Sequence, residues 1–204
     1  MEDLKSTYNK IAEDWAKDHA VDTWWIEGTD KFCSVIKPKS SILDVGCGAG
    51  FKSKYLTDKG FKVTGVDFSE KMIEAAKRKY SSIDFDVVDL YDLDTYKKKF
   101  DAVFAQAVLL HVPKSRIVEV LEKMRDKLNE GGFLYIAVKE RREGEVEEGV
   151  KEENDYGYQY KRFFSYFNLP ELEDYLKKVD MKLVWKDISN SGRTNWLQIV
   201  AEKV

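Results

Sequence analysis

Hydrophobic positions follow two different periods along the middle of the chain. Short apolar runs predict buried strands. Between these runs the apolar positions have helical spacing, which is clearest over 115–128. Strands that alternate with helices in this way predict a parallel sheet covered by helices on both faces. The predicted strands are 41–45, 61–67, 83–89, 100–106 and 133–138.

Local signals set the limits of the helices in this region. A helix is expected over 51–58, directly after a glycine-rich turn. Ser69 is a suitable N-cap for the next helix, because its hydroxyl can accept a hydrogen bond from a free backbone N–H. The pair Gly131-Gly132 is expected to end the helix over 115–128.

The two flanks of this region differ from it. Residues 3–36 have helical spacing and several aromatic side chains. The stretch 140–155 is rich in charge and has little periodicity, so we expect a mobile surface loop. Seven aromatic residues follow within 156–167. Two strands, 181–188 and 195–203, close the chain, and the residues between them are typical of a hairpin turn.

The composition is that of one folded domain. The chain has 204 residues, of which 43% are hydrophobic and 35% are charged. A net charge of -3 does not indicate a nucleic-acid-binding protein, although a local basic patch stays open. No apolar run approaches the ~18 residues of a membrane span, and the N-terminus lacks the apolar segment of a signal peptide. With two cysteines and two histidines, we expect a cytoplasmic protein without a disulfide framework or a metal site.

The sequence ILDVGCGAG, residues 42–50, carries the clearest chemical signal. A predicted strand ends near Asp44, and glycines follow at Gly46, Gly48 and Gly50 before a helix begins. Glycine lets a ligand approach the main chain closely, and doubly wound folds bind nucleotides at this edge of the sheet. The dinucleotide fingerprint has its third glycine one position later, where this chain has Phe51.

Two further aspartates follow the next strands. Asp67 ends the strand over 61–67, about twenty residues after the glycines, where a carboxylate can accept both hydroxyls of a ribose. Asp89 ends the strand over 83–89, where a carboxylate can accept from the exocyclic amine of adenine. A single strand-end aspartate is commonly only solvated. Three of them around one glycine loop favour a nucleotide site.

These segments resemble the class I S-adenosylmethionine (SAM)-dependent methyltransferases, the broad group that includes ubiquinone- and menaquinone-biosynthesis-like enzymes. The resemblance covers roughly the central 100 residues, in family order and with family-like spacing. It is specific for the cofactor and says little about the methyl acceptor. The segments are LDVGCGAG (43–50), GVDFS (65–69), VVDL (87–90), FDAVFAQAVLLHV (100–112) and LNEGGFLYIAV (128–138).

The resemblance implies a Rossmann-like α/β fold, a doubly wound seven-stranded sheet that is mostly parallel with an antiparallel last strand. The predicted terminal hairpin agrees with it. We expect a single methyltransferase domain over 1–204. Its parts would be an N-terminal helical lid (1–37), the cofactor-binding core (38–140), a flap with an acceptor-side segment (141–170), and the C-terminal helix with the β-hairpin (171–204).

The resemblance also implies cofactor contacts. Asp67 would take the ribose hydroxyls, and Phe68 would pack on the adenine. The loop after Asp44 would hold the amino acid part of SAM, and Tyr8 is a candidate to cover the cofactor, although a packed helix would show the same aromatic. The expected cofactor-binding residues are Tyr8, Asp44, Gly46, Cys47, Gly48, Gly50, Asp67, Phe68, Asp89, Leu90, Ala105 and Gln106.

His111 is the candidate general base, because neutral imidazole near pH 7 suits that role. The alternative is that it only caps or packs. His19 is expected on the surface of a charged helix.

Aromatic residues on both flanks are candidates for the acceptor pocket. Arg162 could orient an anionic group of the acceptor there. The aromatic run could also simply cover the edge of the sheet, and the acidic stretch before it is expected to be a solvated flap. The expected acceptor-pocket residues are Trp24, Trp25, Tyr160, Arg162 and Phe163.

The resemblance therefore implies SAM-dependent methyl transfer to a small-molecule acceptor, with S-adenosylhomocysteine (SAH) as product, by a monomer or homodimer. Three alternatives stay open at this point: a tRNA- or RNA-modifying methyltransferase, a dinucleotide oxidoreductase, and a non-catalytic SAM-binding protein. The sequence AQAVLLH stands where amino-group methyltransferases of DNA, glutamine and rRNA carry an Asn/Asp-Pro-Pro-Tyr motif, which disfavours that chemistry.

Overall fold

The structure is a computed structural model that describes residues 4–204. The predicted helical lid begins at residue 1, so its first three residues lie outside the described part. The α-helices are α1 (Leu4–Asp18), α2 (Ile26–Val35), α3 (Phe51–Asp58), α4 (Glu70–Lys79), α5 (Ile117–Asp126) and α6 (Leu169–Lys178). The strands are β1 (Ser41–Val45), β2 (Lys62–Asp67), β3 (Asp84–Val87), β4 (Phe100–Gln106), β5 (Leu128–Lys139), β6 (Glu148–Glu153), β7 (Tyr160–Ser165), β8 (Met181–Ser191) and β9 (Thr194–Lys203).

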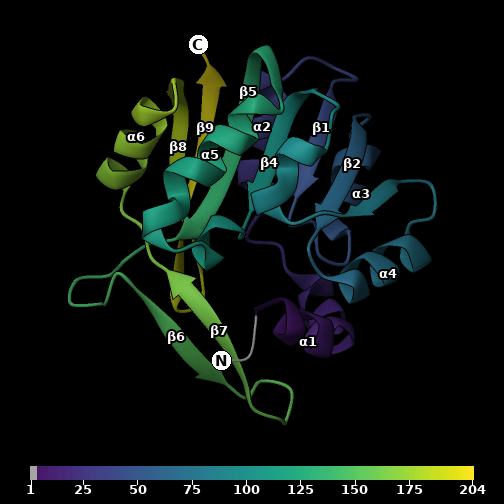
Figure 1. The fold of residues 1–204 in the computed structure, drawn as a ribbon, viewed down its shortest axis with the longest axis vertical. Helices are drawn as coiled ribbons and strands as arrows, with labels where there is room; N and C mark the ends of the chain where they lie inside the picture. The colour runs from purple at the N-terminus through teal and green to yellow at the C-terminus, as the bar shows by residue number, and fades with distance from the viewer. Residues whose placement is uncertain (1–3) are drawn as a thin grey trace.

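Seven of the strands form one sheet in the order β3-β2-β1-β4-β5-β9-β8 (Figure 1). The first five pair in parallel, while β9 is antiparallel to both of its neighbours, β5 and β8. The predicted doubly wound, mostly parallel sheet with an antiparallel last strand is confirmed. The strand order reverses between β1 and β4, and ligands of such folds bind beyond the carboxyl ends of the strands at this point.

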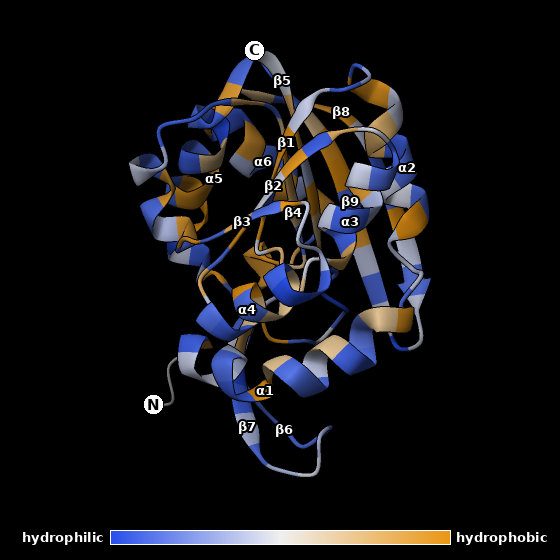
Figure 2. Cartoon of the chain, turned by 90° about the vertical axis from the view of Figure 1, so that its right-hand side faces the viewer, coloured by the Kyte–Doolittle hydropathy of each residue, from blue (hydrophilic) through white to orange (hydrophobic). Residues whose placement is uncertain are grey.

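The two faces of the sheet bury different side chains. Val103 of β4 packs with Leu121 of α5 on one face, and its neighbour Phe104 packs with Phe32 of α2 on the other. This alternation is the period of two expected for a strand buried on both sides. Figure 2 shows the apolar strands running between the helical layers. No helix within residues 4–204 is both long and apolar enough to cross a membrane.

Helix α1 covers no face of the sheet but lies beyond the carboxyl ends of the parallel strands (Figure 1). Asn9 of α1 binds the start of α4, accepting from the Ser69 hydroxyl at 2.7 Å. On its other side, the Thr7 hydroxyl donates to the Lys161 carbonyl of β7 at 3.1 Å. Ser69 is the N-cap of α4, as predicted, and accepts from the Met72 N–H. The helix α1 is thereby held over the site between α4 and β7.

Two predictions about local structure are wrong. Helix α5 ends at Asp126, and β5 begins at Leu128, so Gly131 and Gly132 lie inside the strand instead of ending the helix. The strand is irregular there, because its pairing with β4 shifts register between Phe100 and Ala102.

The second wrong prediction is the loop over 140–155, because residues 148–153 form β6 and pair with β7. The two strands form a separate ribbon that projects below the main sheet (Figure 1). Its period-two signal is hidden because most of β6 is exposed and charged. Strand β6 is instead held by its pairing with β7, in which Glu153 lies opposite Tyr160 and forms an ion pair with Arg162.

Candidate functional site

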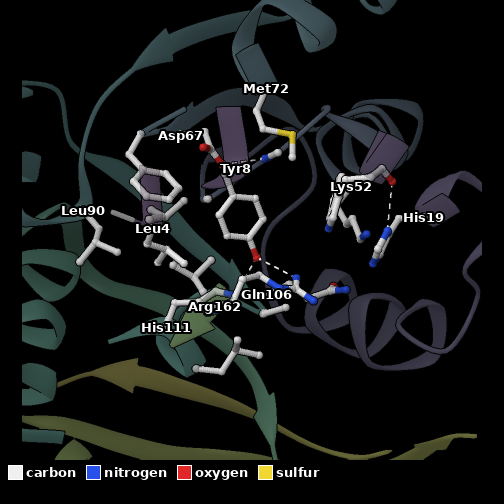
Figure 3. A pocket seen from close by; sticks show the side chains of 18 of the residues that line it. Leu4, Tyr8, His19, Lys52, Asp67, Met72, Leu90, Gln106, His111 and Arg162 are labelled. Atoms are coloured by element: carbon white, nitrogen blue, oxygen red, sulfur yellow. Dashed lines mark hydrogen bonds between the residues drawn. The ribbon is translucent and has the colours of Figure 1, made fainter. Parts of the chain in front are cut away.

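A cavity of about 510 Å³ lies beyond the carboxyl ends of β1, β2 and β4, beneath α1 (Figure 3). This volume is in the range of sites for small molecules and cofactors. Of the predicted site residues, those that line it are Tyr8, Trp24, Gly46, Gly48, Asp67, Phe68, Asp89, Leu90, Gln106, His111 and Arg162. Those outside its lining are Trp25, Asp44, Cys47, Gly50, Ala105, Tyr160 and Phe163.

The glycine loop folds back onto β2. The N–H groups of Gly46 and Cys47 both donate to the Val66 carbonyl, at 2.7 and 3.0 Å. Gly46 has φ +67°, and a Cβ there would lie 2.4 Å from a methyl carbon of Val108. Only glycine fits this turn. The loop therefore presents bare backbone to the cavity.

Asp67 is a buried carboxylate at the end of β2, with 6% of its surface exposed. One of its oxygens accepts from the Gly48 N–H at 3.0 Å and the other from the Ser69 N–H at 2.9 Å. Burial raises the pKa of Asp67 to about 6. Each oxygen keeps a further lone pair. A ligand hydroxyl donating to those lone pairs would stabilise the buried charge.

Asp44 lies behind the glycine loop. Its carboxylate accepts from the Ser53 hydroxyl at 2.5 Å, and burial raises its pKa to about 7. The polar group that reaches the cavity at this point is Lys52, in the first turn of α3. Its ammonium lies 5.3 Å from the ring centroid of Trp25, and burial lowers the pKa of Lys52.

Asp89 lies just after β3, which ends at Val87. Its carboxylate accepts from the Tyr91 N–H at 2.9 Å and caps a short 3-10 helix, Leu90–Thr95. This cap fixes the backbone so that Asp89, Leu90 and Tyr91 all line the cavity.

Three side chains from distant parts of the chain meet at the other side of the cavity (Figure 3). The Tyr8 hydroxyl lies 2.7 Å from His111 Nε2, and Arg162 donates to the same hydroxyl at 3.2 Å. His111 Nδ1 lies 2.7 Å from the Phe163 carbonyl, which can only accept, so this nitrogen carries the proton. Nε2 is therefore bare and accepts from Tyr8.

Burial, followed by the nearby cations Arg162 and Lys139, lowers the pKa of His111 to about 3. The ring is neutral at pH 7, and its free lone pair is already engaged by the Tyr8 hydroxyl. A proton from a bound acceptor therefore reaches His111 only through Tyr8 or after Tyr8 has moved.

Gln106, at the end of β4, places an unsatisfied amide in the cavity wall. It is 7% exposed, and neither polar atom of its side chain has a hydrogen-bond partner among the described residues. Such a buried group costs about 1–3 kcal/mol. An amide that offers both a donor and an acceptor is suited to a polar ligand in the cavity.

Comparison with known proteins assigns the family. The model of a family described as "Methyltransferase domain" matches residues 42–132, which include the glycine loop, Asp67, Asp89 and Gln106. Residues 42–132 therefore belong to this methyltransferase domain family, in agreement with the resemblance to the class I SAM-dependent methyltransferases. A ubiquinone biosynthesis O-methyltransferase of Coxiella burnetii is 32% identical over 100 residues, covering 47% of this chain and 42% of that protein. One from Pelagibacter ubique is 31% identical over 134 residues, covering 64% and 53%.

The chain spans about half the length of these curated relatives. Solved structures match more of it. A Burkholderia thailandensis 1,6-didemethyltoxoflavin-N1-methyltransferase has a TM-score of 0.79 at 19% identity, covering 98% of this chain and 87% of that one. A SAM-dependent methyltransferase from Methanosarcina mazei has a TM-score of 0.76 at 20% identity, covering 85% and 97%. At this identity the likeness confirms the fold.

Of the residues predicted for the acceptor pocket, only Trp24 and Arg162 line the cavity, and the alternation of β7 explains why Phe163 does not. Side chains of a strand point to opposite faces in turn. Arg162 and Phe164 line the cavity, whereas Phe163 presents only its carbonyl to His111. Tyr160 is buried and donates to Asp155 at 2.8 Å. Trp25 is also buried and donates from its indole N–H to the Asp22 carbonyl.

Several lining residues were not predicted from the sequence. Lys139 is the last residue of β5, as Asp67 is of β2, and its position at the carboxyl end of a strand could have placed it in the site. Lys52 follows the glycine turn and reaches the cavity from the first turn of α3. His19 was expected on the surface but stacks on Trp15, with ring centroids 4.2 Å apart, and lines the cavity. No local pattern marks it. Lining residues outside the predicted site list also include Trp15, Asp22, Phe164 and Trp196.

Proposed function

We propose that this chain transfers a methyl group from SAM to a small-molecule acceptor and releases SAH. The observation that carries the proposal is Asp67, a buried carboxylate that faces the cavity and accepts from the backbone N–H groups of Gly48 and Ser69 instead of pairing with a cation. A ribose diol supplies the donors that such a carboxylate lacks. A phosphate would be repelled by it.

The residues of the cavity fit SAM. Asp67 would hold the ribose, Asp89 and Leu90 the adenine, and Gly46 and Gly48 the amino acid part, with Lys52 near its carboxylate. The unpaired amide of Gln106 would accept from and donate to the methionine portion. Bound SAM supplies a methyl group on a positively charged sulfur, which is open to attack by a nucleophile.

The chain's own residues would supply orientation and a proton path. Helix α1 covers the cavity and keeps water from it, while the cavity walls align the acceptor, and alignment of this kind is worth up to about 7–11 kcal/mol in well-oriented systems. A hydroxyl or ammonium acceptor must also lose a proton. The Tyr8 hydroxyl would take it and pass its own proton to His111 Nε2, since the two groups already share a hydrogen bond.

A small-molecule acceptor is favoured over RNA by the shape and charge of the chain. The site is a cavity under a helix, with aromatic walls, and the net charge is -3. The matched relatives are named for ubiquinone biosynthesis and for didemethyltoxoflavin methylation, both small-molecule reactions. We further propose a cytoplasmic location, which the unpaired thiols of Cys33 and Cys47 support.

A thermal-shift series with SAM, SAH, NADH and buffer tests the proposal. A ligand at ~100 times its dissociation constant adds about 2.7 kcal/mol of stability. For a chain of this size, that raises the midpoint by roughly 5–10 °C. We expect the shift with SAM and SAH, and none with NADH. A shift with NADH alone would favour an oxidoreductase, and SAM binding without turnover on any acceptor would favour a non-catalytic binding protein.

A further inference from the structure

The end of the cavity formed by β5, β7 and β9 has aromatic walls and one cation. Lys139 of β5 is the cross-strand partner of Trp196 of β9. Its ammonium lies 4.2 Å from the ring centroid of Phe164 and 6.0 Å from that of Trp196. Trp196 in turn stacks on Trp24, with ring centroids 3.9 Å apart. The four side chains all line the cavity.

This end of the cavity is separate from the place of Asp67. Asp67 ends β2 and Lys139 ends β5, and β1 and β4 lie between these two strands. Three inter-strand spacings amount to about 14 Å. A ligand held at Asp67 therefore leaves the Lys139 end to a second molecule.

Lys139 differs in its charge balance from the neighbouring cation. Arg162 is neutralised by Glu153, which it binds through two nitrogens at 2.6 and 2.7 Å. Lys139, by contrast, forms no ion pair within residues 4–204; its ammonium makes two cation–π contacts, and the carboxylates of Glu153 and Asp155 attract it only from beyond ion-pair distance. Burial and the charge of Arg162 lower its pKa to about 8, so it is mostly protonated at pH 7.

We propose that this end of the cavity binds a planar aromatic acceptor that carries an anionic group, with the Lys139 ammonium on the anion and the Phe164 and Trp196 rings against the acceptor's ring. The inference rests on the proposed function, because the acceptor must lie beside the sulfonium of SAM. The sulfonium would add a second positive charge near the Lys139 ammonium. Of the carboxylates that line the cavity, Asp67 and Asp89 follow β2 and β3, and Asp22 attracts Lys52. An anionic acceptor compensates the two positive charges, whereas a neutral or cationic acceptor leaves them unpaired.

The test uses the full chain saturated with SAH, with 1-naphthoate and uncharged 1-naphthamide as probes of equal shape. Binding is followed by calorimetry and by tryptophan fluorescence, to which Trp24 and Trp196 of the cavity wall contribute. We expect naphthoate to bind about tenfold more tightly than naphthamide, which matches a hydrogen bond to a charged group. Lys139→Gln should reduce that preference to within about twofold. Lys161→Gln is the matched control, because Lys161 is an exposed lysine of β7 outside the cavity, and it should keep the preference.

Two results overturn the inference: equal binding of the two probes to the wild-type chain, or a preference that survives Lys139→Gln. The first comparison needs no variant, so misfolding of a mutant cannot hide the answer. SAH binding to each protein is measured beforehand. If SAH binds and the charge preference is absent, the acceptor assignment alone fails. If SAH does not bind, the proposed function fails, and the inference fails with it.

Discussion

Replacing Gln106 with leucine should change stability and ligand binding in opposite directions. The amide of Gln106 is 7% exposed, and neither of its polar atoms has a partner among the described residues. Leucine has a similar volume and no polar atoms, so Gln106→Leu removes a buried penalty of about 1–3 kcal/mol. Taking about 2 kcal/mol, the unfolding midpoint of the ligand-free protein rises by roughly 4–8 °C.

The same substitution removes the group that we assign to the methionine part of SAM. We expect the dissociation constant of SAH to rise about tenfold, which corresponds to about 1.4 kcal/mol. Differential scanning calorimetry gives the midpoint, and isothermal titration calorimetry gives the dissociation constant. A less stable variant with unchanged SAH affinity would refute the reasoning, since it would mean that Gln106 serves the fold.

Gln198 offers a matched control from the core. It is buried like Gln106, but its amide is satisfied: it accepts from the Tyr135 hydroxyl at 2.5 Å and donates to Ser189 at 2.8 Å. Gln198→Leu leaves the buried Tyr135 hydroxyl without this acceptor. We expect it to lose about 1–2 kcal/mol of stability and to keep its SAH affinity. Equal stability changes at the two glutamines would contradict the account.

Three further predictions concern charges and protons in the site. Burial raises the pKa of Asp67 to about 6, and its ionised form accepts the ribose hydroxyls, so SAH should bind more weakly as the pH falls from 7 to 5. The same raised pKa makes the ligand-free fold more stable as the pH falls over this range. Calorimetry should therefore show SAH affinity decreasing while stability increases, and parallel changes would disprove the assignment. Tyr8→Phe keeps the ring but removes the hydroxyl that lies against His111. Turnover should fall about tenfold or more, while the dissociation constant of SAH should stay within about twofold of the wild-type value. Full turnover would exclude Tyr8 from the proton path. Glu153→Gln leaves Arg162 without its partner and should lower the free energy of unfolding, measured with urea, by about 3 kcal/mol. Glu152→Gln, at an exposed neighbour, should lower it by less than about 0.5 kcal/mol. Equal losses would mean that the ion pair contributes nothing to the fold.

Features encoded in short segments were predicted from the sequence. The glycine loop, the strand that ends at Asp67 and the N-cap Ser69 each depend on residues within a few positions of one another. Parallel strands also bring their carboxyl ends to one edge of the sheet. Asp67 and Gln106, which end β2 and β4, and Asp89, which follows β3, could therefore be assigned to one site from the sequence alone.

Features that depend on distant pairings were not predicted. Strand β6 of the β6–β7 ribbon is mostly exposed and charged, so it carries no period-two signal, and the Glu153–Arg162 pair that secures the ribbon is visible only in the fold. The bond between Tyr8 and His111 joins residues 103 positions apart. Lys139 meets Trp196 because an antiparallel strand is inserted beside β5, and no local pattern specifies that register.

A crystal structure of the chain with SAH bound would test the central claim most directly. We expect SAH in the cavity beneath α1, with both ribose hydroxyls within hydrogen-bond distance of the Asp67 carboxylate and the Gln106 amide paired with the homocysteine part. SAH bound elsewhere, or in this cavity with its ribose away from Asp67, would contradict it.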